Sequence, residues 1–162
     1  MFLASQADAP HDFDFEIGDW TVQHRRLKQR LRNCQEWEAF EGLSSTQKIL
    51  GGFGNLEDNQ LFFPEGSFRA IALRSYDRNE KLWSIWWLDG RFPGRLDTPV
   101  VGRFDKGIGL FYANDRLGDL PIRIRFTWSM SANGHPHWEQ AFSADEGGTW
   151  ETNWTMDFAP LR

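Results

Sequence analysis

The chain has 162 residues, a formal net charge of −5 and 25% charged residues, a composition typical of one globular domain rather than a disordered chain. The negative charge argues against a nucleic-acid backbone or an anionic membrane as a partner. Cys34 is the single cysteine, so neither a disulfide within the chain nor a cysteine-based structural zinc site is expected.

The chain begins with MFLASQADAPHDF, which has no basic segment and only a short apolar run. A signal peptide is therefore not expected. No stretch approaches the roughly 18 apolar residues of a membrane-spanning helix. We therefore expect a cytoplasmic protein that does not insert into a membrane.

Helical periodicity is nearly absent, and short runs rich in β-branched and aromatic residues alternate with turn residues. Two connections, 51–66 and 89–97, are longer than a hairpin needs and are interpreted as loops at a barrel rim. The predicted strands, in chain order, are 20–31, 37–42, 44–50, 67–76, 81–88, 98–104, 108–113, 121–130, 137–143 and 150–158.

Nearly all the remaining links are of hairpin length, which predicts an antiparallel meander. A sheet of about ten strands protects its edges most simply by closing on itself. We therefore predict an all-β fold, a single closed antiparallel meander barrel of about ten strands. One domain is expected over residues 1–162, with residues 1–19 forming a tail and a plug at one end of the barrel.

Nine Trp and fourteen Phe beside only two Tyr indicate either a thick core or an aromatic-lined cavity. Alternation along the later strands directs one apolar set inward. The first strand places His24 and Arg26 on the side of Trp20, and strand 67–76 carries Arg69 on one face. The predicted ligand contacts are His24, Arg26, Arg69, Trp87, Trp128, Trp138, Gln140 and Trp154.

Gly18-Asp19-Trp20 opens the first long strand and resembles the Gly-x-Trp signature of the lipocalin/calycin superfamily. That resemblance implies a lipocalin-like barrel in which the Trp packs across the closed end, and a plug made of Phe13, Phe15, Gly18 and Trp20. The chain is also similar to a group of uncharacterised bacterial lipocalin-like proteins. The segments that carry this similarity are HDFDFEIGDW, HRRLKQRL, LGGFGN, PVVGRF, WEQAFS and TWETNWTMDF.

Few residues indicate a metal site, a cofactor site or a catalytic site. His135-x-His137 lies beside a turn and is interpreted as solvated, so no metal site is predicted. No cofactor is expected, although haem held by His24 is kept as an alternative. If the barrel catalyses a reaction, His24 and Glu139 are the candidate acid–base residues.

The predicted function is binding of a small, mostly apolar or aromatic ligand inside the barrel. The first alternative is a cofactor-independent isomerase or cyclase on the same barrel, by analogy with the superfamily. The second is a barrel filled by its aromatic residues that acts as a protein-interaction module. The sequence leaves open the ligand, a homodimer and the register of each strand.

Overall fold

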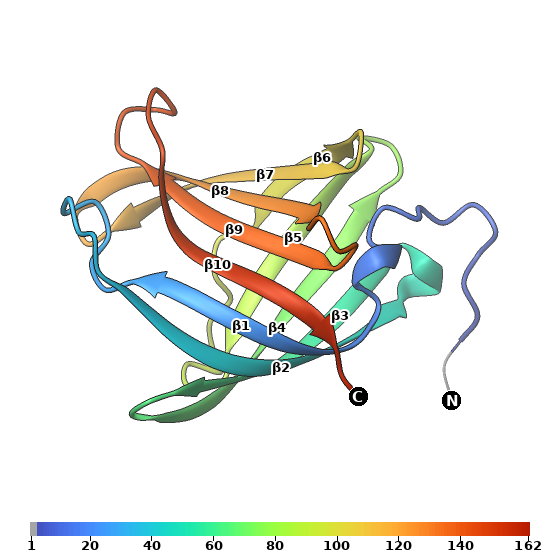
Figure 1. Cartoon of the computed structure of the whole chain (residues 1–162). Helices are drawn as coiled ribbons and strands as arrows, with labels where there is room; N and C mark the ends of the chain where they lie inside the picture. The colour runs from blue at the N-terminus through green and yellow to red at the C-terminus, as the bar shows by residue number, and fades with distance from the viewer. Residues whose placement is uncertain (1–2) are drawn as a thin grey trace.

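The computed structural model describes residues 3–162, in which ten strands close into one antiparallel barrel (Figure 1). Consecutive strands pair with each other, and β1 also pairs with β10 to complete the ring. The predicted all-β closed barrel is confirmed. Its elements are η1 (Asp14–Glu16), β1 (Gly18–Leu27), β2 (Trp37–Ile49), η2 (Leu50–Gly52), β3 (Gly54–Phe63), β4 (Gly66–Asp77), β5 (Leu82–Asp89), β6 (Val100–Asp105), β7 (Ile108–Leu117), β8 (Leu120–Met130), β9 (Pro136–Ser143) and β10 (Glu151–Pro160).

The strand count was right because two errors compensated each other: one strand was predicted as two, and one strand was predicted as a loop. The predicted first strand 20–31 also ends earlier, at Leu27. The predicted strands 37–42 and 44–50 form the single strand β2, in which Gly42 stays in register with Val22 and Leu61. The predicted loop 51–66 contains β3. Its inward residues include Asn55, Glu57 and Asn59, so the alternation that normally signals a strand is hidden by buried polar side chains.

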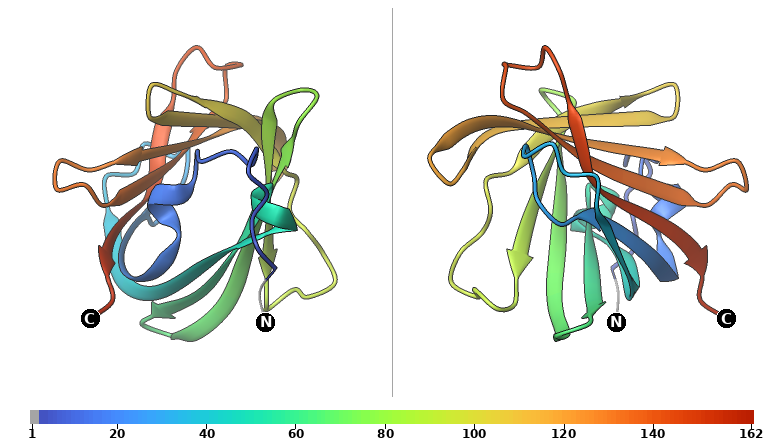
Figure 2. Two further views of the ribbon diagram at one scale, coloured as in Figure 1. Left: turned by 90° about the vertical axis from the view of Figure 1, so that its right-hand side faces the viewer. Right: turned by 60° about the vertical axis from the view of Figure 1, so that its left-hand side comes forward.

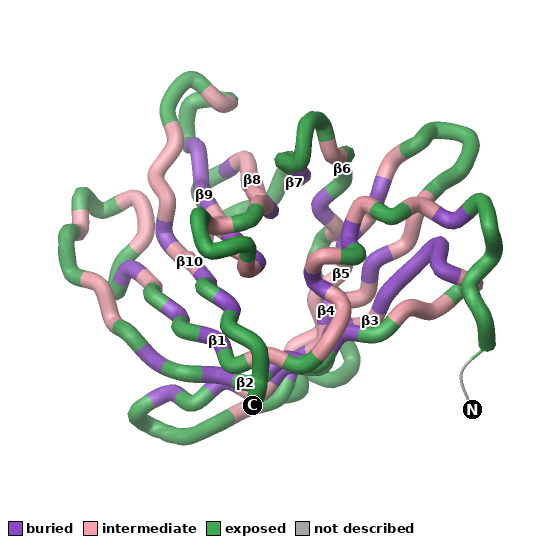
Figure 3. The backbone as a smooth tube through the Cα atoms, turned by 45° about the vertical axis from the view of Figure 1, so that its right-hand side comes forward, coloured by how far each residue is buried: buried purple, intermediate pink, exposed green. Residues whose placement is uncertain are grey.

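The barrel interior has two unlike sides. Most of the buried polar and charged side chains of the strands lie in β1 to β4, while β5 to β10 contribute mostly large apolar ones. Buried and exposed positions alternate along the strands (Figure 3), as expected for strands with one face inward. The buried polar residues of β1 to β4 are His24, Ser44, Thr46, Asn55, Glu57, Asn59 and Arg74.

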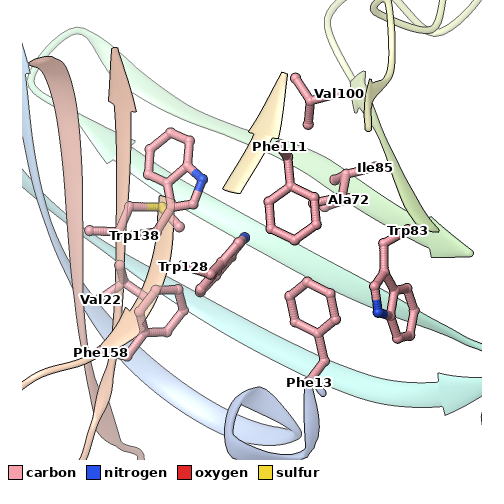
Figure 4. Packing of buried hydrophobic residues seen from close by; sticks show 11 residues of the cluster. Phe13, Val22, Ala72, Trp83, Ile85, Val100, Phe111, Trp128, Trp138 and Phe158 are labelled. Carbon is pink, nitrogen blue, oxygen red and sulfur yellow. The ribbon is translucent and has the colours of Figure 1, made fainter. Parts of the chain in front are cut away.

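The N-terminal segment closes one end of the barrel. η1 lies within the ring of strands there (Figure 2, left). Phe13 is 2% exposed and meets the ring of Trp83 edge-on at 4.9 Å (Figure 4). It also meets the ring of Phe104 edge-on at 4.8 Å. Phe15 stacks on Phe13, and the Trp20 indole N–H donates to the Glu16 carbonyl at 2.9 Å.

The segment is held from the strands as well. The indole N–H of Trp83 donates to the Asp12 carboxylate at 2.9 Å, and Lys48 pairs with Asp14 at 2.6 Å. Gly18 has φ of +137°, a conformation that side chains rarely adopt, at the point where the chain leaves η1 and enters β1. The four predicted plug residues therefore lie together at the closed end.

Replacing Phe13 by Ala should lower the free energy of unfolding by about 3–5 kcal/mol, because it empties a site enclosed by four aromatic rings. Urea unfolding followed by Trp fluorescence measures the change. Phe92→Ala is the control, since Phe92 is 58% exposed in the β5–β6 loop and should cost much less. Equal effects of the two substitutions would contradict the plug.

Gly102 in β6 is a position of close backbone approach. A Cβ atom built there would lie 1.8 Å from the Leu110 carbonyl oxygen in β7. Gly102→Ala should therefore push β6 from β7 and lower stability by about 3 kcal/mol, at the upper end of overpacking effects. Gly94→Ala is the matched control, because no atom lies within 4 Å of its added Cβ. Thermal unfolding of both variants gives the comparison, and similar midpoints would refute the prediction.

Candidate functional site

An interior cavity of about 150 Å³ lies between the two sides of the barrel. An apolar cavity of roughly this volume is enough for one benzene-sized molecule in other proteins. Five predicted ligand contacts lie in its wall: Trp87, Trp128, Trp138, Gln140 and Trp154. The other aromatic residue of the wall is Phe126, and the other polar ones are Glu57, Arg74, Asp97, Thr98 and Asp115.

Strand alternation brings most of this wall together. Phe126 and Trp128 point inward from β8, and Trp138 and Gln140 from the neighbouring β9. In β10 a bulge between Thr152 and Trp154 shifts the register. Strict alternation from Trp154 would turn Asn153 outward, but Asn153 is fully buried and accepts a hydrogen bond from Gln140 Nε2 at 2.8 Å. The simple alternation applied to the sequence could not anticipate the bulge.

A buried ion cluster forms the inner end of the cavity. Arg74 in β4 is 1% exposed, and its Nη1 donates to Glu16 Oε2 at 3.1 Å and to Asn55 Oδ1 at 2.7 Å. Its Nη2 donates to the Glu57 carboxylate. Thr46 donates to Glu16 at 2.8 Å and Ser44 to Glu57 at 3.2 Å. We call Glu16, Ser44, Thr46, Asn55, Glu57 and Arg74 the Arg74 cluster.

The Arg74 cluster joins the plug to the cavity, because Glu16 belongs to η1 and Glu57 and Arg74 line the cavity. Burial raises the pKa of Glu16 well above its ordinary value, and the neighbouring Glu57 carboxylate raises it further, against the opposing charge of Arg74. Glu16 therefore keeps its proton to higher pH than an exposed glutamic acid does.

Two buried N–H groups in the cavity wall have no hydrogen-bond partner among residues 3–162. They are Arg74 Nε and Trp128 Nε1, and the guanidinium carbon of Arg74 lies 5.0 Å from the Trp128 ring centroid. Buried donors are nearly always satisfied in folded proteins. The inner end of the cavity therefore has two buried donors, on neighbouring wall residues, that no acceptor among residues 3–162 satisfies.

The cavity also reaches acidic side chains at its other end. Asp97 and Thr98 come from the β5–β6 loop, the long connection predicted as 89–97, and Asp115 comes from β7. The backbone N–H of Asp97 donates to the Trp87 carbonyl at 2.9 Å, which sets the acid beside the aromatic wall. Asp97 is exposed to solvent. The partial loss of its hydration beside the cavity raises the pKa of Asp97, and the charges of Asp115 and Asp89 add to the rise against that of Arg95.

His24 and Arg26 face the interior but do not line the cavity. His24 stacks on Phe40 at 4.6 Å, and its Nδ1 accepts a hydrogen bond from Trp154 Nε1 at 3.1 Å. Arg26 pairs with Glu38 at 2.7 Å and lies over the rings of Phe63 and Trp154. The expected direct ligand contacts are thus replaced by contacts to Trp154, which His24 and Arg26 hold in place.

Burial lowers the pKa of His24 to about 3, with a further contribution from the nearby charge of Arg26. His24 is therefore neutral at physiological pH. The structure also argues against its use as a haem ligand, because Nδ1 is occupied by Trp154 and a Cβ built at Gly42 would come within 2.8 Å of Nε2. The residues present do not fit haem.

Two further candidates lie on the outside of the barrel. Arg69 is exposed and pairs with Asp58, because odd-numbered positions of β4 face outward while Ala70, Ala72 and Arg74 face inward. Glu139 accepts a hydrogen bond from His137 Nε2 at 3.0 Å on the outer face of β9. Neither side chain can contact a ligand inside the barrel. The expected placement of Arg69 was wrong by one position of register. Glu139 lies on the face of β9 opposite to Trp138 and Gln140, so its expected acid–base role inside the barrel was wrong.

Within residues 3–162, no group of three or more His, Cys, Asp and Glu side chains is placed to hold a metal ion. No helix in the same range is long and apolar enough to cross a membrane. Comparison with protein-family models and with curated protein sequences finds no match. The cavity and its wall therefore carry the functional inference.

Proposed function

We propose that this protein is a lipocalin-like barrel that binds one small, mostly apolar, ring-containing molecule in its interior. The observation that carries the proposal is the cavity of about 150 Å³ with five aromatic side chains in its wall. Such side chains offer flat, apolar contact surface, and a few polar groups at the ends of a pocket orient what binds there. The proposal includes a cytoplasmic location, where the free thiol of Cys34 stays reduced.

The two alternatives have less support. A filled barrel would leave no such cavity, whereas the aromatic side chains here surround one. An isomerase or cyclase would need an acid or base against the substrate, and neither His24 nor Glu139 lines the cavity. We therefore favour binding over catalysis.

A cavity-filling substitution tests the binding function. Ala72 lies in the cavity wall and is 5% exposed, so Ala72→Phe should occupy the space that a ligand needs. The probes are indole, naphthalene and 4-ethylphenol, titrated against the protein's Trp fluorescence, with native mass spectrometry to record any molecule that copurifies. The variant should bind each probe at least about tenfold more weakly than the unmodified protein, a change of roughly 1.4 kcal/mol.

Ala39→Phe is the matched control, because Ala39 is exposed on the outer side of β2 and a ring added there leaves the cavity unchanged. Circular dichroism confirms that both variants fold. The proposal fails if none of the probes binds the unmodified protein and no ligand copurifies with it. It also fails if Ala72→Phe, while folded, binds the probes as tightly as Ala39→Phe does.

A further inference from the structure

The charged residues in the cavity wall are unbalanced. Three are acids, Glu57, Asp97 and Asp115, and one is a cation, Arg74. The guanidinium of Arg74 already donates to Glu16, Asn55 and Glu57. The wall therefore offers no free cation to a carboxylate or phosphate, and an anionic ligand would enter a site whose remaining charges are negative.

The two acids at the outer end, Asp97 and Asp115, are exposed at the mouth of the cavity and have no ion-pair partner among the described residues 3–162. Three charges act on the Asp97 carboxyl group. Those of Asp115 and Asp89 have the same sign as an Asp97 carboxylate, and that of Arg95 has the opposite sign. Asp89 is itself paired with Arg91 at 2.8 Å. Two unpaired carboxylates at one end of a cavity form a site that a cation would stabilise.

Aromatic faces adjoin these acids. Asp97 is hydrogen-bonded through its backbone to Trp87, and Trp87 shares the cavity wall with Phe126, Trp138 and Trp154. An ammonium group gains attraction from aromatic faces, most of all from Trp, when it is held within about 6 Å of a ring. The outer end of the cavity thus combines the two features, carboxylates and aromatic rings, that recognise amines.

The inner end supplies an independent sign of an occupant. Arg74 Nε and Trp128 Nε1 are buried N–H donors without partners, on side chains that are 1% and 2% exposed and that line the cavity. A ligand oxygen near them would provide the missing acceptor. A hydroxyl group would suit this end best, because it can accept from these donors and also donate to the Glu57 carboxylate.

We propose that the ligand of this cavity is a small phenolic amine. Its ammonium group binds beside Asp97 and Asp115, its ring lies among the tryptophans, and its hydroxyl faces Arg74, Glu57 and Trp128. This inference rests on the proposed binding function and specifies its ligand class. The proposed ligand class excludes fatty acids and aromatic carboxylates, which are apolar molecules with an anionic group at one end.

Four probes of nearly equal size separate the contributions of the ammonium group and the hydroxyl group to binding. Tyramine has both the ammonium and the hydroxyl group, phenethylamine lacks the hydroxyl, 4-ethylphenol lacks the ammonium, and 3-(4-hydroxyphenyl)propionate carries a carboxylate instead. Calorimetric titration should find tyramine about tenfold tighter than phenethylamine or 4-ethylphenol. The carboxylate should bind most weakly, and added salt should weaken tyramine but not 4-ethylphenol.

The double substitution Asp97→Asn and Asp115→Asn should bring tyramine to within about twofold of 4-ethylphenol and leave 4-ethylphenol unchanged. Asp119→Asn, at the tip of the β7–β8 hairpin and outside the cavity wall, is the control and should leave tyramine unchanged. If 4-ethylphenol binds but tyramine binds no more tightly, or if the carboxylate equals tyramine, the phenolic amine is wrong while the binding function stands. If no probe binds, the binding function itself fails.

Discussion

Replacing Arg74 by Met is expected to lower the free energy of unfolding by about 3–5 kcal/mol. The substitution keeps most of the side-chain volume but removes the guanidinium that lies between the buried carboxyl groups of Glu16 and Glu57. Both groups would remain buried without their shared cation, and Asn55 would lose its donor. Removing one partner of a buried ion cluster costs more than the cluster contributes, because the remaining charges cannot return to water.

The cause is tested by removing the carboxylates as well. In the triple variant with Arg74→Met, Glu16→Gln and Glu57→Gln, a large part of the lost stability should return, since no buried ionisable group remains in the cluster. Arg78→Met is the exposed control: Arg78 pairs with Asp8 at the surface and should contribute about 1 kcal/mol or less. Urea unfolding measures all three. A triple variant no more stable than Arg74→Met would show that packing, not charge, explains the loss.

Acid is expected to destabilise the barrel through His24. Its pKa is lowered to about 3 in the folded protein, against about 6.5 when unfolded. Between these values the unfolded chain binds a proton that the folded chain does not, so stability falls as the pH falls through this window. The free energy of unfolding changes by up to about 1.4 kcal/mol per pH unit in this window. Its loss reaches about 2–3 kcal/mol near pH 4.5. Below pH 3 both states are protonated and the slope vanishes.

His24→Gln should flatten this dependence, because glutamine does not titrate yet can still accept the hydrogen bond of Trp154. Glu16 acts in the opposite direction: its raised pKa makes stability fall as the pH rises above the ordinary value of 4.5. The difference between the unmodified protein and His24→Gln, from chemical unfolding at several pH values, isolates His24. His11→Gln is the control, since His11 is exposed. An unchanged slope in His24→Gln would refute the assignment.

The aromatic half of the site was predictable because its strands follow simple rules. β8 and β9 alternate apolar and polar residues, so the sequence alone predicts that Trp128, Trp138 and Gln140 face inward. Trp87 and Trp154 also line the cavity as expected. The plug residues were expected from the resemblance of Gly18-Asp19-Trp20 to the Gly-x-Trp signature, and the structure brings Phe13, Phe15 and Trp20 to one end of the barrel.

The polar half was not predictable in the same way. Asn55 and Glu57 lie in a stretch with so many polar residues that it was interpreted as a loop, although it is β3. Their burial makes sense only beside Arg74, which lies on the neighbouring strand and is distant from Glu16 in sequence. Asp97 and Asp115 carry no local signal at all, because a loop and a strand from different parts of the chain bring them to the same cavity.

The sequence by itself determined that the chain is an antiparallel closed barrel, because strand alternation and hairpin-length links are local properties that leave few other arrangements. It also determined that the interior would be rich in tryptophan. Only the tertiary structure decided which polar groups meet: Arg74 with Glu16 and Glu57, and His24 with Trp154. The reason is physical. Hydrophobic burial follows from the pattern along one strand, whereas the pairing of buried charges depends on register and on contacts between distant segments.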